Sequence, residues 1–165
     1  MDYKNMGENK MKKICFTSSS GGHFNQLNIL MNRYNEYEQV IITEKTSFVE
    51  NELKYKNKYL FDVINRNEKL FFIKFAIYTI KMLLIMIKEK PDIVISTGAL
   101  LTVPVCYIGK ILGAKVIFIE SFAKVNTPTL SGRLVYKISD KFIVQWEDML
   151  KCYNSDKVEY GGTIY

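Results

Sequence analysis

The chain has 165 residues, of which 48% are hydrophobic and 24% are charged. These proportions fit one globular domain and exclude a disordered chain, and the length leaves no room for two separate cores. The formal net charge is +6, and only three of the 23 basic residues are arginines. Proteins that read nucleic-acid bases rely on arginine. The lysine-rich excess therefore favours an anionic lipid surface or a diphosphate ligand, or it serves solubility alone.

The three cysteines, Cys15, Cys106 and Cys152, are widely spaced and odd in number. No pair of them has the spacing of metal ligands, so we expect no metal site and a reducing, cytoplasmic environment. Cys15 and Cys106 stand within apolar runs and are expected to be buried. The polar segment 1–10 lacks the apolar core of a signal peptide and is expected to be a disordered extension or tag. The folded domain is then 11–165.

Apolar blocks alternate along the chain in a pattern that predicts strands and helices in turn. Strands are expected at 13–18, 39–43, 92–96, 115–119 and 141–145, and helices at 24–34, 70–87, 102–112 and 131–138. The polar stretch 44–58 gives no clear prediction. Continuous apolar strands separated by helices are typical of a parallel sheet covered on both faces. The predicted fold is one α/β domain with a Rossmann-like, doubly wound parallel sheet.

A glycine-rich turn separates the first predicted strand from the first helix. It consists of Ser18, Ser19, Ser20, Gly21 and Gly22. Doubly wound sheets bind ligands at the carboxyl ends of their strands, and a helix N-terminus attracts anions. A phosphate or diphosphate is the predicted guest, with a purely structural tight turn as the alternative. The spacing matches neither the dinucleotide loop nor the P-loop, and we recognise no acidic residue at the end of the second strand to hold a ribose.

His23 is the only histidine of the chain, and it follows this turn directly. The positive end of the helix favours a neutral imidazole, which can act as a base or as a hydrogen-bond donor. No partner for it is visible in the sequence, so a structural role is the alternative.

The stretch 70–87 is the most apolar part of the chain. Two internal lysines make a membrane crossing costly, by about 2.5–3.5 kcal/mol each. The helix is either a crossover buried on the sheet or an interfacial helix whose lysines reach lipid headgroups. Its apolar arc is wider than packing against one face of a sheet requires, which favours the interfacial helix at a membrane surface. The residues expected to associate with a membrane are Phe71, Phe72, Lys74, Phe75, Lys81, Leu83, Leu84 and Ile87.

Three segments together carry a resemblance to a known family. They are KICFTSSSGGHFNQL (13–27), KPDIVISTGALLTVPVCYIGKILGAKVIFIE (90–120) and PTLSGRLVYKISDKFIVQWEDMLKCY (128–153). The chain resembles bacterial polysaccharide-biosynthesis glycosyltransferase subunits of the PssD and EpsE type. These are similar to the membrane-anchoring subunit of the eukaryotic two-part UDP-GlcNAc transferase of dolichol-linked oligosaccharide synthesis. The resemblance implies a split GT-B glycosyltransferase, of which this chain is the MurG-like N-terminal half.

The resemblance also implies roles for individual residues. The turn from Ser18 to His23 matches the loop for the acceptor diphosphate, and His23 is expected to deprotonate or orient the acceptor hydroxyl. Thr97 and Gly98 match a loop that faces the same cleft. Glu120 is expected to contact the acceptor or a partner, with a helix or loop cap as the alternative.

The function implied is that of the acceptor-binding, membrane-recruiting subunit of a two-component UDP-sugar glycosyltransferase. It would extend an undecaprenyl-diphosphate-linked saccharide in capsular or exopolysaccharide synthesis, peripherally at the cytoplasmic face of the cell membrane. The UDP-sugar is expected to bind mainly on a donor-binding partner subunit, and hexosyl transfer is expected only, or mainly, with that partner. No metal or other cofactor and no nucleic acid is expected. The alternatives are a non-catalytic scaffold or activator of the transferase and a free-standing α/β nucleotide-sugar-binding enzyme.

Overall fold

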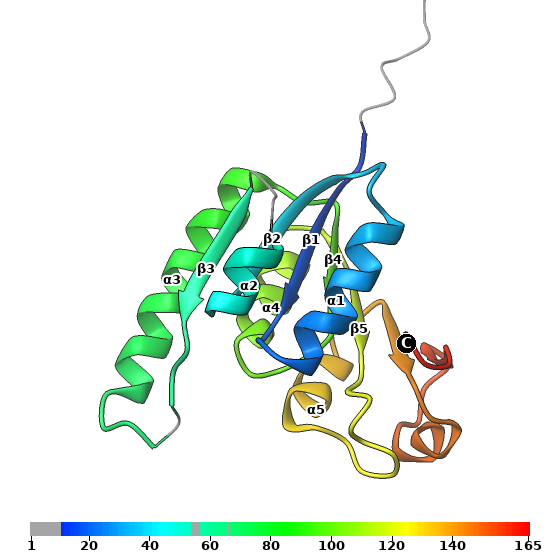
Figure 1. Ribbon diagram of the computed structural model, residues 1–165. Coiled ribbons are helices and arrows are strands. Elements are labelled where there is room, and N and C mark those ends of the chain that lie inside the picture. The colour runs from blue at the N-terminus through cyan, green and yellow to red at the C-terminus, as the bar shows by residue number, and fades with distance from the viewer. Residues whose placement is uncertain (1–10, 54–56, 66) are drawn as a thin grey trace, which may run out of the picture.

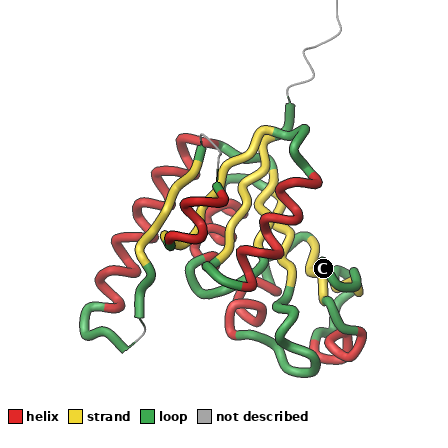
Figure 2. Tube along the Cα trace, viewed as in Figure 1, coloured by secondary structure: helices red, strands yellow, loops and turns green. Residues whose placement is uncertain are grey.

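A computed structural model describes residues 11–53, 57–65 and 67–165 of the chain. The predicted extension at 1–10 lies outside these described residues. The described chain forms one parallel sheet of seven strands with helices on both of its faces (Figures 1 and 2). The strands are β1 (Lys13–Ser18), β2 (Glu38–Lys45), β3 (Lys58–Asp62), β4 (Ile93–Ser96), β5 (Lys115–Ile119), β6 (Lys141–Val144) and β7 (Val158–Tyr160). The helices are α1 (Gly22–Arg33), α2 (Ser47–Glu52), α3 (Phe71–Glu89), α4 (Thr102–Ile111), α5 (Leu130–Tyr136) and the 3₁₀ turn η1 (Glu147–Cys152).

The strands lie in the order β3-β2-β1-β4-β5-β6-β7, and every neighbouring pair is parallel. On one side of β1 lie β2 and then β3, and on its other side lie β4, β5, β6 and β7 in chain order. This is the doubly wound, Rossmann-like arrangement that the apolar pattern predicts, with one additional edge strand. The order reverses between β1 and β4, so the loops that follow these two strands flank a crevice at the carboxyl edge of the sheet.

The one domain has a hydrophobic cluster on each face of its sheet, and alternate residues of the central strands pack into one cluster or the other. In β1, Ile14 and Phe16 pack with α1 and α2, whereas Cys15 packs with α3 and α4 on the other face. Residues of β2, β4 and β5 alternate between the two clusters in the same way. Because successive side chains of a strand point to opposite faces, a strand covered on both faces is apolar throughout.

The two predicted buried cysteines, Cys15 and Cys106, are both fully buried in the same cluster. Burial raises the pKa of the Cys106 thiol to about 12, and burial likewise raises the pKa of Cys15. Both thiols therefore stay protonated at neutral pH and behave as small hydrophobic groups.

Four elements escape prediction, namely β3, α2, η1 and β7, and they are the short or exposed ones. The edge strand β3 has a single buried side chain, Phe61, and β7 is three residues long with none. The helix α2 has six residues and buries only Val49. Thr46 caps α2, since its side chain accepts a hydrogen bond from the backbone N–H of Val49. Such segments lack the apolar periodicity on which a prediction depends.

Gly109 is the point at which α4 crosses β4 and α3. A Cβ atom at this position would lie 2.6 Å from Cγ2 of Val94 and 3.2 Å from Cε of Met86. The glycine thus allows the helix to approach the sheet closely, and any side chain would push the two layers apart.

We expect Gly109→Ala to destabilise the fold by about 1–2 kcal/mol, because overpacking outweighs the gain in helix propensity. The measurement is the free energy of unfolding in urea. Ile111→Ala, at an 81% exposed position of the same region, is the control and should change that free energy little. An unchanged or raised stability for Gly109→Ala would contradict the close packing described here.

Candidate functional site

The glycine-rich turn connects the end of β1 to the start of α1. Gly21 is the N-cap residue of α1 and has φ 73° and ψ −140°, a conformation that residues with a side chain rarely adopt. No side chain caps this helix end. The N–H groups of Gly22, His23 and Phe24 are the first of the helix and have no acceptor within it. These donors, together with the helix dipole, favour an anion at this end of α1.

His23 joins this turn to the loop that follows β4. Its Nδ1 lies 2.7 Å from the carbonyl oxygen of Thr97, and the Thr97 hydroxyl donates to the carbonyl oxygen of His23 at 2.8 Å. A carbonyl only accepts, so Nδ1 must carry the proton in this contact. In the neutral ring, Nε2 is then the acceptor. The structure therefore supplies the partner that the sequence did not reveal, and it gives the imidazole the tautomer that a base needs.

The loop after β4 has an unusual backbone that buried hydroxyls support. Gly98 has φ 103° and Ala99 has φ 85°, two successive residues in the left-handed region. The Ser96 hydroxyl accepts a hydrogen bond from the N–H of Gly98 at 3.1 Å and donates to the hydroxyl of Thr102 at 2.9 Å. A non-glycine residue with positive φ costs on the order of 1–3 kcal/mol, and such residues cluster at ligand sites.

Glu44 stands at the carboxyl end of β2, and its place corrects one prediction. The expected strand ends at 43 with no acidic residue assigned to its end, whereas β2 extends to Lys45 and includes Glu44. The Glu44 carboxylate accepts from the backbone N–H of Ser20 at 2.9 Å and from the Ser20 hydroxyl at 2.8 Å. The first half of the turn is thus already bound to an anionic group, and the N–H groups of the first turn of α1 are the donors that remain.

The three serines of the turn occupy different environments. Ser18 is fully buried, and its hydroxyl lies 3.3 Å from that of Thr43. Ser20 is bound to Glu44, and Ser19 lines a cavity. Of the predicted phosphate-binding hydroxyls, Ser19 is therefore the one best placed to meet a ligand.

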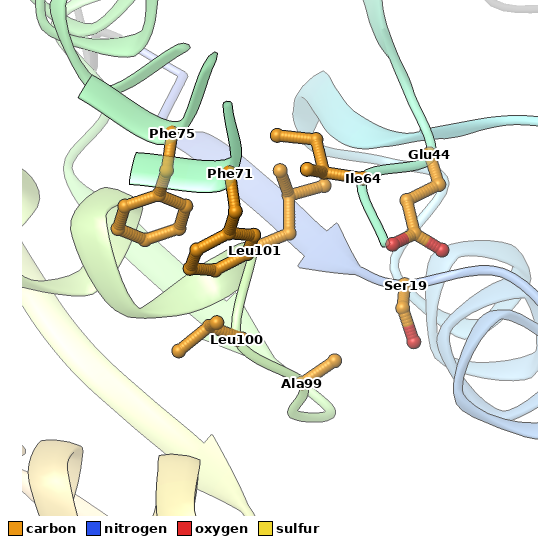
Figure 3. Close-up of a pocket in the computed structure, with 8 residues that line it drawn as sticks. All are labelled: Ser19, Glu44, Ile64, Phe71, Phe75, Ala99, Leu100 and Leu101. Atoms are coloured by element: carbon orange, nitrogen blue, oxygen red, sulfur yellow. The ribbon is translucent and has the colours of Figure 1, made fainter. Parts of the chain in front are cut away.

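Two cavities flank the turn. The α3-side cavity, of about 230 Å³, is shown in Figure 3 and is lined by Ser19, Glu44, Ile64, Phe71, Phe75, Ala99, Leu100 and Leu101. The C-terminal cavity, of about 280 Å³, is lined by Gly22, His23, Gln26, Ser121, Phe122, Ala123 and Tyr165. The predicted residues of the turn thus border both cavities, with His23 on one side and Ser19 on the other. Among the residues that the structure describes, no lysine or arginine lines either of them.

Glu120 is 1% exposed, and hydrogen-bond donors of the protein surround its carboxylate. Oε1 accepts from the N–H of Ser121 at 2.8 Å and from the hydroxyl of Thr129 at 2.7 Å. Oε2 accepts from the hydroxyl of Tyr153 at 2.6 Å and from the N–H of Thr129 at 3.2 Å. Burial, and then the hydrogen bond to Glu120, raise the pKa of Tyr153, which remains a donor at neutral pH. This geometry favours the loop-cap alternative over the predicted ligand contact.

The helix α3 is far less buried than a crossover helix usually is. Of its 19 residues only Met82, Met86 and Glu89 are buried. Four of the predicted membrane-facing residues form an exposed apolar set, namely Phe72, Leu83, Leu84 and Ile87, which Ile73, Ile77 and Ile80 extend. Lys74 and Lys81 are exposed as well, whereas Phe71 and Phe75 are half-buried and line the α3-side cavity. No helix of the described residues has the length and apolar character that crossing a membrane requires.

The Glu120 cluster predicts a large effect on stability from a small change. In Glu120→Gln an amide NH₂ replaces one carboxylate oxygen and faces a backbone N–H, that of Ser121 or that of Thr129, which loses its acceptor; we expect this to cost about 1–3 kcal/mol. Urea unfolding measures the loss. The control is Glu159→Gln, where the side chain is 53% exposed and only pairs with Lys141, so little change is expected. Equal stability of the two variants would show that the cluster does not hold this loop.

The sequence of the chain is similar to that of proteins of one known family. The family model described as "Oligosaccharide biosynthesis protein Alg14 like" matches residues 66–164. The UDP-N-acetylglucosamine transferase subunit ALG14 of Candida albicans is 45% identical over 85 residues, which are 48% of this chain and 38% of that protein. The human subunit of the same name is 33% identical over 72 residues, which are 40% of this chain and 33% of that protein. The matched part therefore spans well under half the length of these relatives.

Solved structures show the same fold. MurG of Acinetobacter baumannii superposes with a TM-score of 0.73 at 13% identity, covering 90% of this chain and 45% of that one. A UDP-N-acetylglucosamine 2-epimerase of Rickettsia bellii gives 0.71 at 14% identity, covering 93% and 45%. This chain thus has the fold of somewhat less than half of each protein, as expected for one Rossmann-like half of a GT-B structure. Since the family model covers more than half of the sequence, the chain belongs to the Alg14-like family of oligosaccharide biosynthesis proteins.

Proposed function

We propose that this protein is the acceptor-binding, membrane-recruiting subunit of a two-component UDP-sugar glycosyltransferase. The acceptor is a saccharide linked to a lipid diphosphate, with undecaprenyl diphosphate as the carrier in capsular or exopolysaccharide synthesis. The observation that carries the proposal is the glycine-rich turn at the sheet reversal. It leads into an uncapped helix N-terminus with an oriented imidazole, and its Ser19 lines a cavity together with Phe71 and Phe75 of the exposed apolar helix α3. Membership in a family whose relatives are named as transferase subunits supports the same assignment.

The diphosphate of the acceptor binds at the first turn of α1 in this proposal. The carboxylate of Glu44 already holds Ser20 and repels a second anion there. The N–H groups of Gly22 and His23 and the positive end of the helix dipole are left for the phosphate oxygens. No lysine or arginine is among the described residues that line the two cavities, so backbone dipoles are the described source of compensating charge at this point.

In the transfer reaction, this subunit has to position the acceptor saccharide and to supply a group that takes up a proton. Nδ1 of His23 is occupied by the Thr97 carbonyl, so the lone pair of Nε2 is the one directed to a ligand. Nε2 takes the proton of the acceptor hydroxyl. At the same time the oxygen of that hydroxyl bonds to the anomeric carbon of the donor sugar. The bond from that carbon to UDP breaks, and UDP leaves on the donor-binding partner subunit.

Membrane recruitment follows from the outer face of α3. Exposed apolar side chains from Phe72 to Ile87 would otherwise remain in water, and burial of one such side chain is worth about 1.5–3 kcal/mol. Lys74 and Lys81 lie on the same exposed helix, and the net charge of the chain is +6. A leaflet of anionic lipids would bury these apolar side chains and attract the lysines. The protein is then attached peripherally at the cytoplasmic face of the membrane.

A transfer assay tests the catalytic part of the proposal. Radiolabelled UDP-sugar is incubated with lipid-linked acceptor and with this chain, its donor-binding partner, or both together. We expect transfer only, or mainly, with both, and a loss of about 10²–10⁴-fold in kcat for His23→Ala, the range of a lost general base. Asn32→Ala, at an exposed position of the same helix, is the control. Full activity of His23→Ala would support a scaffold, and equal activity of this chain alone would show a complete enzyme.

Sedimentation with liposomes tests membrane recruitment. We expect the double variant Phe72→Ser/Leu84→Ser to bind anionic liposomes at least about tenfold more weakly, because two exposed apolar anchors are lost. Phe48→Ser is the matched control, since Phe48 is 50% exposed but belongs to α2 on the opposite face of the sheet. Identical binding of both variants would show that α3 does not face lipid.

A further inference from the structure

The α3-side cavity has an apolar end and a polar end, as Figure 3 shows. Phe71 and Phe75 of α3 and the two leucines of the β4–α4 loop form the apolar end. Ser19 and Glu44 form the polar end, next to the glycine-rich turn. The proposed chemistry at His23 takes place at the C-terminal cavity, and it assigns no part of the acceptor to the α3-side cavity.

We propose that the α3-side cavity holds the isoprenoid segment next to the diphosphate of the acceptor, so that the cavity selects a prenyl carrier lipid. This inference rests on the proposed function, since it takes the acceptor to be a lipid diphosphate. It places a hydrocarbon subsite beside the phosphate site, and the two subsites together define the direction in which the acceptor lies.

The walls suit a branched hydrocarbon chain. The rings of Phe71 and Phe75 stack with their centroids 5.8 Å apart and their planes at 17°. Opposite them, Leu101 is 7% exposed and Leu100 is half-buried. A volume of about 230 Å³ admits a short stretch of such a chain and not a whole polyprenyl group, the rest of which stays in the bilayer.

The cavity is continuous with the face of α3 that is proposed to meet lipid. The Phe71 ring packs edge-on against that of Phe72, with centroids 5.3 Å apart. Phe72 is 82% exposed and lies on the outside of the helix. A hydrocarbon chain that leaves the bilayer along Phe72 therefore meets an aromatic surface all the way to the cavity and is never fully exposed to water.

Glu44 sets the direction of the acceptor. A diphosphate cannot lie against its carboxylate without strong repulsion, so the anion must sit beyond Ser20, at the start of α1. The lipid then lies on the α3 side, the diphosphate over Gly22, and the saccharide beside His23 and the C-terminal cavity. This order places the sugar hydroxyl next to Nε2 and keeps the hydrocarbon away from it.

Binding of two probes to the whole chain tests the inference without relying on transfer. The probes are farnesyl diphosphate and inorganic diphosphate, measured by titration calorimetry. We expect the wild type to bind farnesyl diphosphate at least about tenfold more tightly, because each buried methylene contributes roughly fourfold. In Leu100→Trp the indole fills the cavity, so the ratio of the two affinities should fall to near one while the affinity for diphosphate stays the same.

Leu112→Trp is the matched control, since Leu112 is 46% exposed at the far end of α4, and it should keep the wild-type ratio. Phe75→Ala removes one wall instead of filling the space and should also lower the ratio; it serves if Leu100→Trp does not fold. A wild-type ratio near one, a ratio unchanged in both cavity variants, or an equal loss for both probes overturns the inference. Failure of the transfer assay with a preserved prenyl preference overturns the proposed function instead.

Discussion

The pair of hydrogen bonds between His23 and Thr97 joins the two halves of the sheet at the point where the strand order reverses. Each residue uses one side-chain atom and one backbone carbonyl, at 2.7 Å and 2.8 Å, so two contacts connect the start of α1 to the loop that follows β4. This connection fixes the tautomer of the imidazole, and it lies beside the left-handed backbone at Gly98 and Ala99 that the Ser96 hydroxyl supports. A second constraint acts from β2, where Glu44 holds Ser20. The turn is therefore fixed from both neighbouring strands before any ligand arrives, which is the preorganisation that charge-stabilising sites require.

A mismatch in size accounts for the exposed surface of the N-terminal half of α3, which includes Phe72, Ile73 and Ile77. The helix has 19 residues, whereas the edge strand β3 beside it has five and buries one of them. An edge strand this short cannot cover a helix of that length, and Figure 1 shows the N-terminal half of α3 extending past the end of β3. The uncovered half divides its side chains between the outside and the α3-side cavity. The excess of apolar residues is thus a property of the sheet edge as much as of the helix.

Most of the described fold could be predicted, because a buried strand is apolar at nearly every position and can be recognised from its composition alone. The runs KICFTS and KVIFI gave β1 and β5 with the same bounds as the structure, since both faces of these strands are covered. The site was less predictable. Helical periodicity places Phe71 and Phe75 on an apolar arc but cannot say which neighbour they meet. Glu44 acquires its role from Ser20, 24 residues earlier, and only because β2 pairs with β1 in a particular register. The one available signal was its position directly after an apolar run.

The antiparallel course of α3 relative to the strands has a consequence for how substrate would be supplied. A helix of 19 residues is about 28 Å long, and the α3-side cavity lies at its N-terminal end. If this helix rests flat on a bilayer, the opening of the cavity lies at the level of the headgroups and at the margin of the protein's footprint. A carrier lipid then reaches it by lateral diffusion within one leaflet, in two dimensions, and needs no extraction into water. The carboxyl edge of the sheet meanwhile faces sideways, parallel to the membrane, so a second subunit carrying the sugar nucleotide can approach from the aqueous phase without competing for the lipid surface.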